Sequence, residues 1–568
     1  MLELFRISHR STRLAYETLT ALEVWRRQAP SESNGLMVLL GVGPLQADDV
    51  VAVARHDAHV EIGADALDAM GRSRKHIEQL ASSDVPVYGV STGFGALAQR
   101  HIAPELRTQL QKSLIRSHAA GAGPHVEREV VRALMLLRLS TLATGHTGVR
   151  VETAQTLAAL LNAGITPVVH EYGSLGCSGD LAPLAHCALA LMGEGEAYDG
   201  AELRPAAEAL AAHGITPVEL AEKEGLALIN GTDGMLGMLV LAIHDLRKLL
   251  DTADLAAAMS IEGLMGTDRV LAADLQALRP HPGQAASAAH MRDILAGSPI
   301  VESHREGDGR VQDAYSMRCS PQVHGAARDT VDYAATVAGR ELASAIDNPT
   351  VLDDGRVESN GNFHGAPVAY VLDFLAIPVA DVASMSERRT DRFLDTSRSQ
   401  GLPAFLADDP GVDSGHMIAQ YTQAAIVSEL KRLAAPASVD SIPSSAMQED
   451  HVSMGWSSAR KLRKAVDGLG RVLAIEILTA ARGIDLRAPL KPAAVTGAAI
   501  AELRKAVGGP GPDRYLAPEV EAATKLVVAG AFTARPVSAE SDVWQGFRGV
   551  SPAKRHSHGG LAPDRKRF

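Results

Sequence analysis

The chain has 568 residues, of which 46% are hydrophobic and 21% are charged, a composition typical of a well-packed globular protein rather than a disordered or fibrous one. Its 67 acidic and 55 basic residues give a net charge of −12 with no basic stripe outside the two ends, which argues against nucleic acid as a partner. Three cysteines without paired spacing argue against a disulfide framework and favour a reducing, cytoplasmic compartment.

Residues 1–35 are amphipathic and contain several arginines, but Glu3 and Glu17 interrupt them and no continuous apolar stretch precedes a small-residue cleavage site. We therefore expect a poorly ordered extension rather than a secretion signal, with an upstream start or a transit peptide as alternatives. The apolar run from Leu36 to Leu45 is broken by glycine and proline and is too short to span a bilayer. No membrane association is expected.

Between residues 36 and 100, the short apolar runs MVLLGV and VPVYGV predict a few small strands, with a helix at about Ala64–Leu80. Residues 126–163 then carry apolar side chains at helical spacing, and Gly164–Pro167 ends that run. Further alanine- and leucine-rich helices are predicted at 235–251, 366–395, 416–434 and 452–482. Because the longest reach about thirty residues, they indicate parallel rods in one bundle.

The chain shows no internal repeat and no long low-complexity linker. We therefore predict a mainly α fold in a single catalytic unit at about 36–545, with a smaller mixed part at about 36–235 and a long central helical bundle at about 236–545. The last stretch, 546–568, is basic and rich in glycine and proline, and it is expected to be a flexible tail.

The segment GSLGCSGDLAPLAHCALALMGEG begins at Gly173 and has a simple structural interpretation. Ser178 or Asp180 caps a helix, and Pro183 lies in its first turn. This interpretation leaves unexplained why three glycines crowd the residues before and within the cap, where glycine is needed only for unusual bends or close approach.

A chemical interpretation accounts for the glycines. The unhindered amide nitrogen of Gly179 can attack the carbonyl carbon of Cys177, and loss of two waters, one from the Ser178 side, leaves a five-membered methylidene-imidazolone. This ring is an electrophile, which none of the twenty side chains is. Expelling ammonia from an unactivated amino acid requires such an electron sink, usually borrowed from a cofactor.

From about residue 40 to 540, the chain resembles the ammonia-lyase and aminomutase family, which builds 4-methylidene-imidazol-5-one (MIO) from an Ala-Ser-Gly triplet. Here Cys177 stands first, and its side chain becomes only a ring substituent. The resemblance therefore implies a MIO cross-link made from Cys177, Ser178 and Gly179, no external cofactor, and an ammonia-lyase/fumarase-like fold whose N-terminal part carries the MIO loop. The thiol changes the oxidative behaviour expected beside the site.

The stretch VYGVSTGFG places Tyr88 before Gly89, Gly93 and Gly95, which on composition alone is a mobile turn with a core tyrosine. The family carries its catalytic base on such a loop, so the resemblance implies that Tyr88 takes the β-proton. Because a phenol titrates near about 10, we expect the site to lower the pKa of Tyr88 or to supply a strong driving force.

In QDAYSMRCSPQVHG, the three-residue spacing of Gln312, Tyr315 and Arg318 predicts one helix face, which could be a solvated polar face ending at Pro321. An arginine fork beside a tyrosine is also a good receptor for a carboxylate. The resemblance implies that Arg318 binds the substrate carboxylate, that Tyr315 supports the electrophile, and that Gln312 contributes to substrate binding.

Two further segments have ordinary structural interpretations that the resemblance extends. Asn230 in LALINGTDGM marks a helix or strand end with an Asx turn, and the family uses this asparagine near the electrophile's oxygen and the substrate carboxylate. Phe363 lies in the glycine- and asparagine-rich turn SNGNFHG, where the resemblance implies a wall of the prosthetic-group pocket.

Two places bear on the choice of amino acid. Ser117 and His118 in SLIRSHAAG fit a helix end, where a lone histidine is usually a cap or core residue, but in the family this pair faces the substrate ring. Glu449 in SSAMQEDHVSMG could be an acidic helix cap, yet a carboxylate there can also accept a hydrogen bond from an imidazole. The resemblance thus implies conversion of L-histidine to trans-urocanate and ammonia, the first step of histidine degradation.

The alternatives are a tyrosine or phenylalanine ammonia-lyase or aminomutase with the same MIO group, a fumarase-like lyase, and a non-enzymatic scaffold. Ser117, His118 and Glu449 disfavour the first, and the Cys-Ser-Gly triplet disfavours the second. The scaffold is disfavoured because the candidate site residues are all present: Tyr88, Asn230, Tyr315, Arg318 and Glu449. No metal-ligand spacing or phosphate-binding loop is evident, so no metal is expected. The resemblance also implies a homotetramer whose active sites draw residues from more than one subunit. Attack on the electrophile by the amine or by the imidazole ring stays open.

Overall fold

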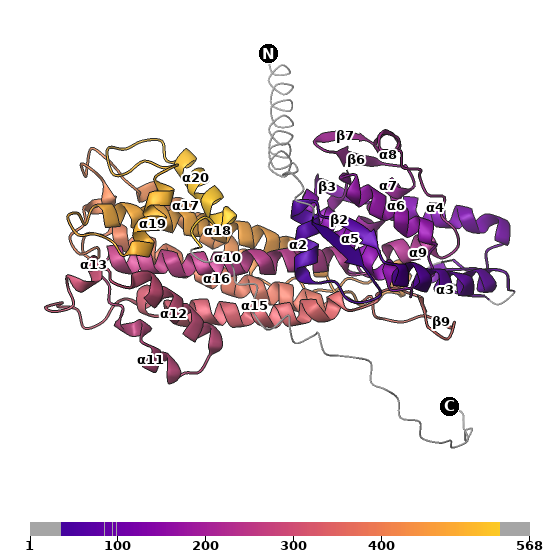
Figure 1. The fold of residues 1–568 in the computed structure, drawn as a ribbon, viewed down its shortest axis with the longest axis horizontal. Helices are drawn as coiled ribbons and strands as arrows, with labels where there is room; N and C mark the ends of the chain where they lie inside the picture. Colours follow the sequence, from indigo (N-terminus) through magenta and orange to yellow (C-terminus); the bar gives the residue numbers. More distant parts are fainter. Residues whose placement is uncertain (1–35, 84–85, 94, 98, 534–568) are drawn as a thin grey trace, which may run out of the picture.

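The computed structural model describes residues 36–83, 86–93, 95–97 and 99–533 of the chain. The extension predicted at 1–35 and the tail predicted at 546–568 lie outside the described residues. Helices make up most of the described chain, so the prediction of a mainly α fold is confirmed. Figure 1 shows an N-terminal part (indigo to purple) at one end of an elongated helical bundle.

The N-terminal part opens with β1 (Met37–Leu40), which pairs in parallel with β2 (His59–Ile62) across α2 (Ala47–His56). Alternate residues of β1 are buried, as the run MVLLGV requires of a half-covered strand. The strand predicted from this run is therefore confirmed, and so is the helix predicted at 64–80, which is α3 (Ala64–Ala81).

The strand predicted from VPVYGV is wrong. Residues 87–90 of the run bend into a turn in which the Val90 amide donates to the Val87 carbonyl at 3.1 Å. Gly89 has a φ of +77°, which ends any extended backbone, and Val90 packs on Ile77 of α3. The apolar side chains of the run therefore mark a buried turn.

The single helical run predicted at 126–163 is two helices, α5 (Arg128–Ala143) and α6 (Val151–Asn162). Gly145 and Gly148 between them have φ values of +78° and +72°, and a Cβ on Gly145 would lie 2.6 Å from that of Ala69. The left-handed backbone and this close approach break the helix. The run ends at β4 (Ile165–Pro167), as predicted.

The remaining elements of the N-terminal part are short. Strand β3 pairs antiparallel with β5, and β4, β6 and β7 form a small antiparallel sheet. Their bounds, with those of the neighbouring helices, are α4 (Arg107–His118), β3 (Ala122–His125), β5 (His170–Tyr172), α7 (Leu181–Leu191), β6 (Glu196–Asp199), β7 (Glu202–Pro205), α8 (Ala206–Ala212) and α9 (Glu224–Ile229).

Long helices build the bundle: α10 (Asp233–Gly263), α15 (Ser320–Leu342), α16 (Ala366–Leu394), α17 (Met417–Leu433) and α18 (Gly455–Asp485). The helices predicted at 366–395, 416–434 and 452–482 are confirmed, whereas the one predicted at 235–251 runs on to Gly263. All of residues 252–263 are buried, the polar ones included, so this part of the helix has no solvent-exposed polar face by which it could be recognised.

Shorter elements surround the bundle. They are α11 (Ala273–Ala277), α12 (Pro282–Leu295), α13 (Pro299–Glu302), α14 (Tyr315–Arg318), β8 (Thr350–Val351), β9 (Val357–Glu358), α19 (Ala494–Leu503) and α20 (Ala517–Ala529). Strands β8 and β9 form an antiparallel hairpin, while α12 packs on α15 and α20 packs on α18.

The bundle has two distinct ends. Helices α10, α16 and α18 begin at the same one, because Gly365 and Gly455 both approach Met235 near the start of α10. Helix α15 runs the opposite way, since Glu341 near its end accepts a hydrogen bond from Thr232 at 2.6 Å. We call this the near end, and it lies against the N-terminal part. At about 1.5 Å per residue, the 31 residues of α10 place the far end about 46 Å away.

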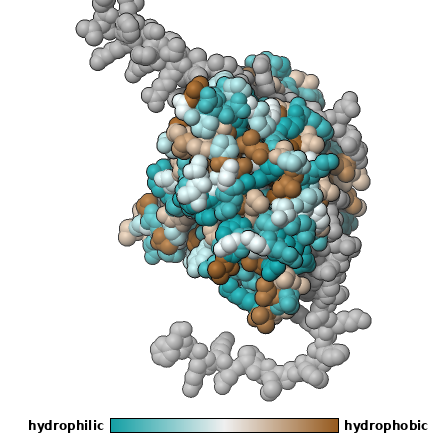
Figure 2. All heavy atoms as spheres, turned by 90° about the vertical axis from the view of Figure 1, so that its left-hand side faces the viewer, coloured by the Kyte–Doolittle hydropathy of each residue, from teal (hydrophilic) through white to brown (hydrophobic). Residues whose placement is uncertain are grey.

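Helix α16 is long and apolar enough to cross a membrane by length and composition, but 61% of its most apolar window is buried in the protein. It packs against α15, α17 and α18. The bundle therefore accounts for most of its apolar residues. In Figure 2, which views the far end, hydrophobic residues form scattered spots among hydrophilic ones.

Candidate active site

The loop Cys177–Gly179 lies at the near end, between β5 and α7. Ser178 has a φ of +50° and Gly179 a φ of +84°, and Gly179 forms isolated β-bridges with Gly176 and Gly231. A Cβ on Gly179 would lie 2.1 Å from the Gly231 carbonyl oxygen, so only glycine fits there. The glycines of this segment thus serve a sharp bend and a close backbone approach, as predicted.

Asp180 joins this loop to the bundle. Helix α7 begins directly after it, as the capping interpretation predicts, but the carboxylate of Asp180 makes no cap on its own helix. It accepts instead from the Met235 amide at 2.9 Å and the Ser174 hydroxyl at 3.0 Å. Complete burial raises the pKa of Asp180 to about 7. The backbone amide of Asp180 donates to Gly231, which ties the loop to the start of α10.

Arg138 on α5 supports the other side of this contact. Its guanidinium donates to the Asn230 carbonyl at 2.7 Å and to the Asp233 carboxylate at 2.5 Å. A Cβ on Gly231 would lie 1.8 Å from Arg138 Nη2. The segment that faces Gly179 is therefore held by a buried cation. The sequence reasoning missed it because no local pattern distinguishes Arg138 from the other arginines of α5.

Asn230 ends α9, as its sequence context predicts, and only 3% of it is exposed. Its side-chain amide donates to the Leu226 carbonyl at 3.1 Å and to the Asn348 carbonyl at 3.4 Å. Both bonds use the amide nitrogen, so the amide oxygen makes no hydrogen bond with the described residues and can serve a ligand.

Glu449 does not cap a helix, because α18 begins six residues later with Met454 as its N-cap. It closes a tight loop in which Ser444 and Glu449 exchange backbone hydrogen bonds of 2.9 and 3.3 Å. Its carboxylate faces the Cys177–Gly179 loop: Glu449 Oε2 accepts from Cys177 Sγ at 2.6 Å and from Ser444 Oγ at 2.8 Å. The acidic cap is thus excluded, and the carboxylate belongs to the site.

Ser117 and His118 form the last turn of α4, the helix end that the sequence predicts. The Ser117 hydroxyl donates to the Leu114 carbonyl at 3.0 Å, and His118 Nδ1 lies 2.9 Å from the same oxygen. Burial lowers the pKa of His118, while the negative charge of Glu449 acts in the opposite direction. His118 is therefore a mainly neutral ring within electrostatic reach of Glu449.

Tyr88 is half-buried, and its hydroxyl accepts a hydrogen bond from the Gly95 amide at 3.3 Å. Burial raises the pKa of Tyr88, and electrostatic interaction with Glu449 and Cys177 adds to that rise, against the lowering effect of the hydrogen bond from Gly95. Of the two expectations for Tyr88, a lowered pKa is not found in the single chain, because burial and an acidic neighbour both raise it. The other, a strong driving force for proton transfer, stays a prediction.

Phe363 lies in the turn that precedes α16, with its side chain half-buried. A Cβ on Gly365 would lie 2.5 Å from Met235 Sδ, and His364 stacks on His451 with ring centroids 5.6 Å apart. The turn is therefore at the near end beside the Glu449 segment. Its role as a pocket wall stays a prediction.

Only two of the three residues predicted to share a helix face lie on a helix. Tyr315 and Arg318 lie on α14, with the guanidinium 4.5 Å from the tyrosine ring centroid, but Gln312 lies outside the helix and that part of the prediction is wrong. The cause is Asp313, a buried residue whose carboxylate accepts from the Thr267 amide at 2.7 Å and fixes the chain before α14.

Helix α14 is at the far end. The Ser316 carbonyl accepts from Arg389, late in α16, at 3.1 Å, and a Cβ on Gly266, just beyond α10, would lie 2.4 Å from the Met317 side chain. One chain therefore brings Tyr88, Ser117, His118, Cys177–Gly179, Asn230 and Glu449 together, whereas Gln312, Tyr315 and Arg318 lie most of the length of α10 away.

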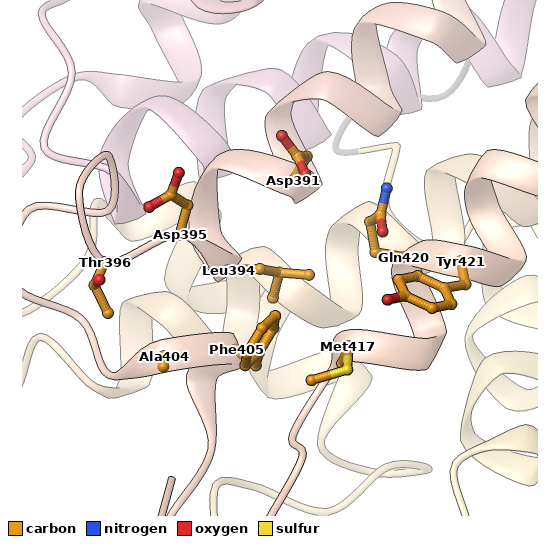
Figure 3. A pocket seen from close by; sticks show the side chains of 9 residues that line it. All are labelled: Asp391, Leu394, Asp395, Thr396, Ala404, Phe405, Met417, Gln420 and Tyr421. Carbon is orange, nitrogen blue, oxygen red and sulfur yellow. The ribbon is translucent and has the colours of Figure 1, made fainter. Parts of the chain in front are cut away.

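A cavity of about 400 Å³ also lies at the far end, between the end of α16 and the start of α17 (Figure 3). Asp391, Asp395, Phe405, Gln420 and Tyr421 are among the residues that line it, and none of the predicted site residues does. Its two carboxylates are already paired with Arg398. The cavity is therefore separate from the site around Cys177.

Comparison with known proteins finds matches over most of the chain. The family model described as aromatic amino acid lyase matches residues 45–505. A histidine ammonia-lyase of Streptomyces griseus is 68% identical over 502 residues, covering 88% of this chain and 98% of that protein.

Two solved structures are also similar. The tyrosine aminomutase from Streptomyces globisporus has a TM-score of 0.83 at 36% identity, over 88% of this chain and 98% of that one. The histidine ammonia-lyase from Trypanosoma cruzi has a TM-score of 0.82 at 38% identity, over 92% and 100%.

Proposed function

This chain belongs to the aromatic amino acid lyase family, and from that membership we propose that it removes ammonia from L-histidine without oxidation to give trans-urocanate. The observation that carries the proposal is the Glu449 carboxylate, which lies directly against the Cys177–Gly179 loop. A carboxylate in that place suits an imidazole, because it can accept a hydrogen bond from the ring and stabilise positive charge on it.

The residues of the loop fit the MIO group. Gly179 has no Cβ to hinder its nitrogen, Ser178 already has a left-handed backbone, and the packing against Gly231 leaves room for nothing larger. Cyclisation of Cys177, Ser178 and Gly179 would supply an electrophile that activates the amino group as a leaving group. The protein then has to orient the substrate, remove its β-proton and exclude water.

The side chains of the near end divide this work. Glu449 binds the imidazole, with Ser117 and His118 lining the ring, and Tyr88 takes the β-proton. The amide oxygen of Asn230 is available to the substrate's amino end. The cations Arg138 and Lys223 of this end are buried and paired with Asp233 and Asp347, so they are not available to the substrate carboxylate or to a phenolate. The proposed site therefore needs another cation.

A second copy of the chain supplies that cation in our proposal. Arg318 and Tyr315 lie at the far end, and Tyr315 is 69% exposed. Helix α16 also exposes Tyr370, Phe374 and Ile377 at helical spacing along the side of the bundle, which suits helix packing between copies. We therefore propose a homotetramer in which Arg318 and Tyr315 of one copy complete the site of another, with Gln312 beside them.

A tyrosine or phenylalanine ammonia-lyase or aminomutase is the second candidate, favoured by the similarity to the tyrosine aminomutase. Glu449 disfavours it, because a phenyl ring offers the carboxylate no hydrogen-bond donor, and a phenol, unlike an imidazole, does not carry the positive charge that a carboxylate stabilises. The three cysteines are free, and with them we propose a cytoplasmic location.

The proposal is tested by following urocanate formation in the ultraviolet, with purified protein and histidine. Ser178→Ala removes the hydroxyl that cyclisation needs, so it should abolish product. Turnover of tyrosine or phenylalanine without turnover of histidine would retain the electrophile and overturn the assignment of Glu449. Inactivity toward all three amino acids would overturn the enzyme assignment itself.

A further inference from the structure

The carboxylate of Glu449 is held on one side only. Cys177 Sγ and Ser444 Oγ both donate to Oε2, at 2.6 and 2.8 Å. Oε1 accepts no hydrogen bond from any residue that the structure describes, and it faces the Tyr88 loop, where a Cβ on Gly95 would lie 3.7 Å from it. One oxygen is thus anchored while the other points toward the residue proposed as the base.

Cys177 is suited to be a lasting donor. Burial raises the pKa of its thiol to about 12, and Glu449 adds to the rise, so the thiol keeps its proton across the neutral range. Cyclisation would join the Gly179 nitrogen to the Cys177 carbonyl carbon, and it uses no atom of the Cys177 side chain. The thiol therefore remains available after the prosthetic group has formed.

We propose that Cys177 is a positioning residue for substrate selection: its thiol holds Oε2 of Glu449 so that Oε1 is presented to the imidazole of the substrate. The inference rests on the proposed function. It gives the first residue of the triplet a second role, in addition to its part in the ring. An alanine in that place could form the same ring but could not donate to Glu449.

Ser444 cannot replace the thiol alone. It lies on the same tight loop as Glu449, so a hydrogen bond between them fixes the side chain relative to its own loop. Cys177 lies on the loop that would form the electrophile, 272 residues from Glu449 in sequence. The hydrogen bond from the Cys177 thiol to the Glu449 carboxylate therefore fixes the carboxylate relative to that loop. The thiol therefore sets the distance that matters for substrate binding.

The test measures ligand binding in the Ser178→Ala background, where histidine is not turned over. Urocanate carries the imidazole, and cinnamate carries a phenyl ring in its place. Adding Cys177→Ala should raise the Kd of urocanate about threefold to tenfold, the loss expected for one hydrogen bond to a carboxylate, and leave the Kd of cinnamate unchanged. Adding Cys177→Ser, which keeps a donor, should restore most of the urocanate affinity.

Cys187→Ala is the matched control, since this thiol is on α7, is buried, and lies ten residues from Cys177. It should leave both dissociation constants unchanged. The proposal is overturned if Cys177→Ala leaves the urocanate Kd unchanged, or if it raises the Kd of urocanate and of cinnamate equally. It is also overturned if Cys177→Ser binds urocanate as weakly as Cys177→Ala, or if Cys187→Ala weakens urocanate binding to the same extent. Absence of urocanate binding to the Ser178→Ala parent would overturn it as well.

Turnover of histidine by the wild-type protein distinguishes failure of the positioning role from failure of the proposed function. If the wild-type protein produces urocanate but Cys177→Ala binds the ligands as its parent does, the positioning role fails and the proposed function stands. If the wild-type protein produces no urocanate from histidine, the proposed function itself fails.

Discussion

Gly179 and Gly231 pack backbone against backbone, and the hydrogen bond from the Asp180 amide to Gly231 continues the contact into α7. Arg138 closes the other side of Gly231 and holds the Asn230 carbonyl. The Cys177–Gly179 loop is therefore clamped between two helix starts. Such preorganisation favours ring closure, because the nitrogen and the carbonyl carbon need little further ordering.

Replacing Gly179 by alanine should abolish activity. The new Cβ would meet the Gly231 oxygen at 2.1 Å, so the loop must move away from the geometry that closes the ring. The measurement is urocanate production, together with the near-ultraviolet difference spectrum of the protein against Ser178→Ala, which reports the prosthetic group.

Gly214→Ala is the control for backbone strain alone. Gly214 has a φ of +67°, but a Cβ there would meet nothing within 4 Å. It should lose about 1–2 kcal/mol of stability and keep its activity. An active Gly179→Ala protein would contradict the clamp described here.

At this scale, the sequence predicted the residues that the near end brings together, because each lies in a short motif that the family resemblance covers. It did not predict Arg138, Ser444 or the hydrogen bond of Cys177 to Glu449. These depend on which distant segments meet, and no local pattern around Arg138 or Ser444 distinguishes them from ordinary helix or loop residues. The raised pKa of Tyr88 also had to come from the structure, since burial decides it.

Among the elements, a buried ion pair connects three loops of the site. Lys223, the N-cap of α9, donates to Asp347 at 2.5 Å, and both side chains are almost fully buried. Asp347 binds the Asn348 amide, and Asn348 accepts from the side chain of Asn230 and from the backbone of Asn360 in the Phe363 turn. The pair thus lies beneath Asn230 and the turn before α16.

The same lysine also contacts the Tyr88 loop, because a Cβ on Gly89 would lie 3.6 Å from Lys223 Cδ and 3.3 Å from Pro349. Burial lowers the pKa of Lys223 and raises that of Asp347, so their mutual attraction has to offset the loss of solvation of both. The Lys223–Asp347 pair therefore holds the loops around Tyr88, Asn230 and Phe363 in place, although burying its two charges is unfavourable.

We expect Lys223→Met to destabilise the protein by about 3–5 kcal/mol, since it leaves Asp347 buried without its cation. The double variant Lys223→Met/Asp347→Leu should recover much of that loss, because neither charge then remains buried. Thermal unfolding of the three proteins measures both effects. Equal melting temperatures for the single and the double variant would contradict this account of the pair.

The long helices were predictable because their apolar residues recur at helical spacing. The incorrect predictions have physical causes that the spacing of apolar residues does not reveal. Glycines with positive φ divide α5 from α6 and turn the VPVYGV run, and full burial hides the last third of α10. A buried aspartate, Asp313, fixes the chain before α14 and leaves Gln312 outside it.

In the molecule as a whole, the groups proposed to bind the two ends of the substrate are at opposite ends of one chain. Glu449 and Tyr88 are at the near end, and Arg318 is at the far end, beyond α10. Sequence spacing could not predict this separation, because it does not reveal which way α15 runs in the bundle. The structure thereby gives the proposed assembly a geometric reason: a single chain does not bring the proposed binding groups together.

Mixing two inactive variants should restore activity. In hybrids of Ser178→Ala with Arg318→Ala, about a quarter of the sites would combine an intact loop from one copy with an intact arginine from another. Co-expression with two different tags, purification through both and the urocanate assay would measure this.

The control pair is Ser178→Ala with Tyr88→Phe. Both positions belong to the near end of the same chain, so their hybrids contain no intact site and should stay inactive. Restored activity in the control, or none in the first pair, would contradict the shared site. Dilution to monomers should likewise abolish activity.

The 31-residue span of α10 also limits how this protein can change in evolution. One residue inserted within the helix would rotate everything beyond it by about 100° and shift it by about 1.5 Å. Asn230 and Met317 are anchored at its two ends, so the near end of one copy would no longer match the far end of another. Insertions and deletions should therefore accumulate at exposed turns such as Gly200 and Gly214, while the length of α10 stays constant among active relatives.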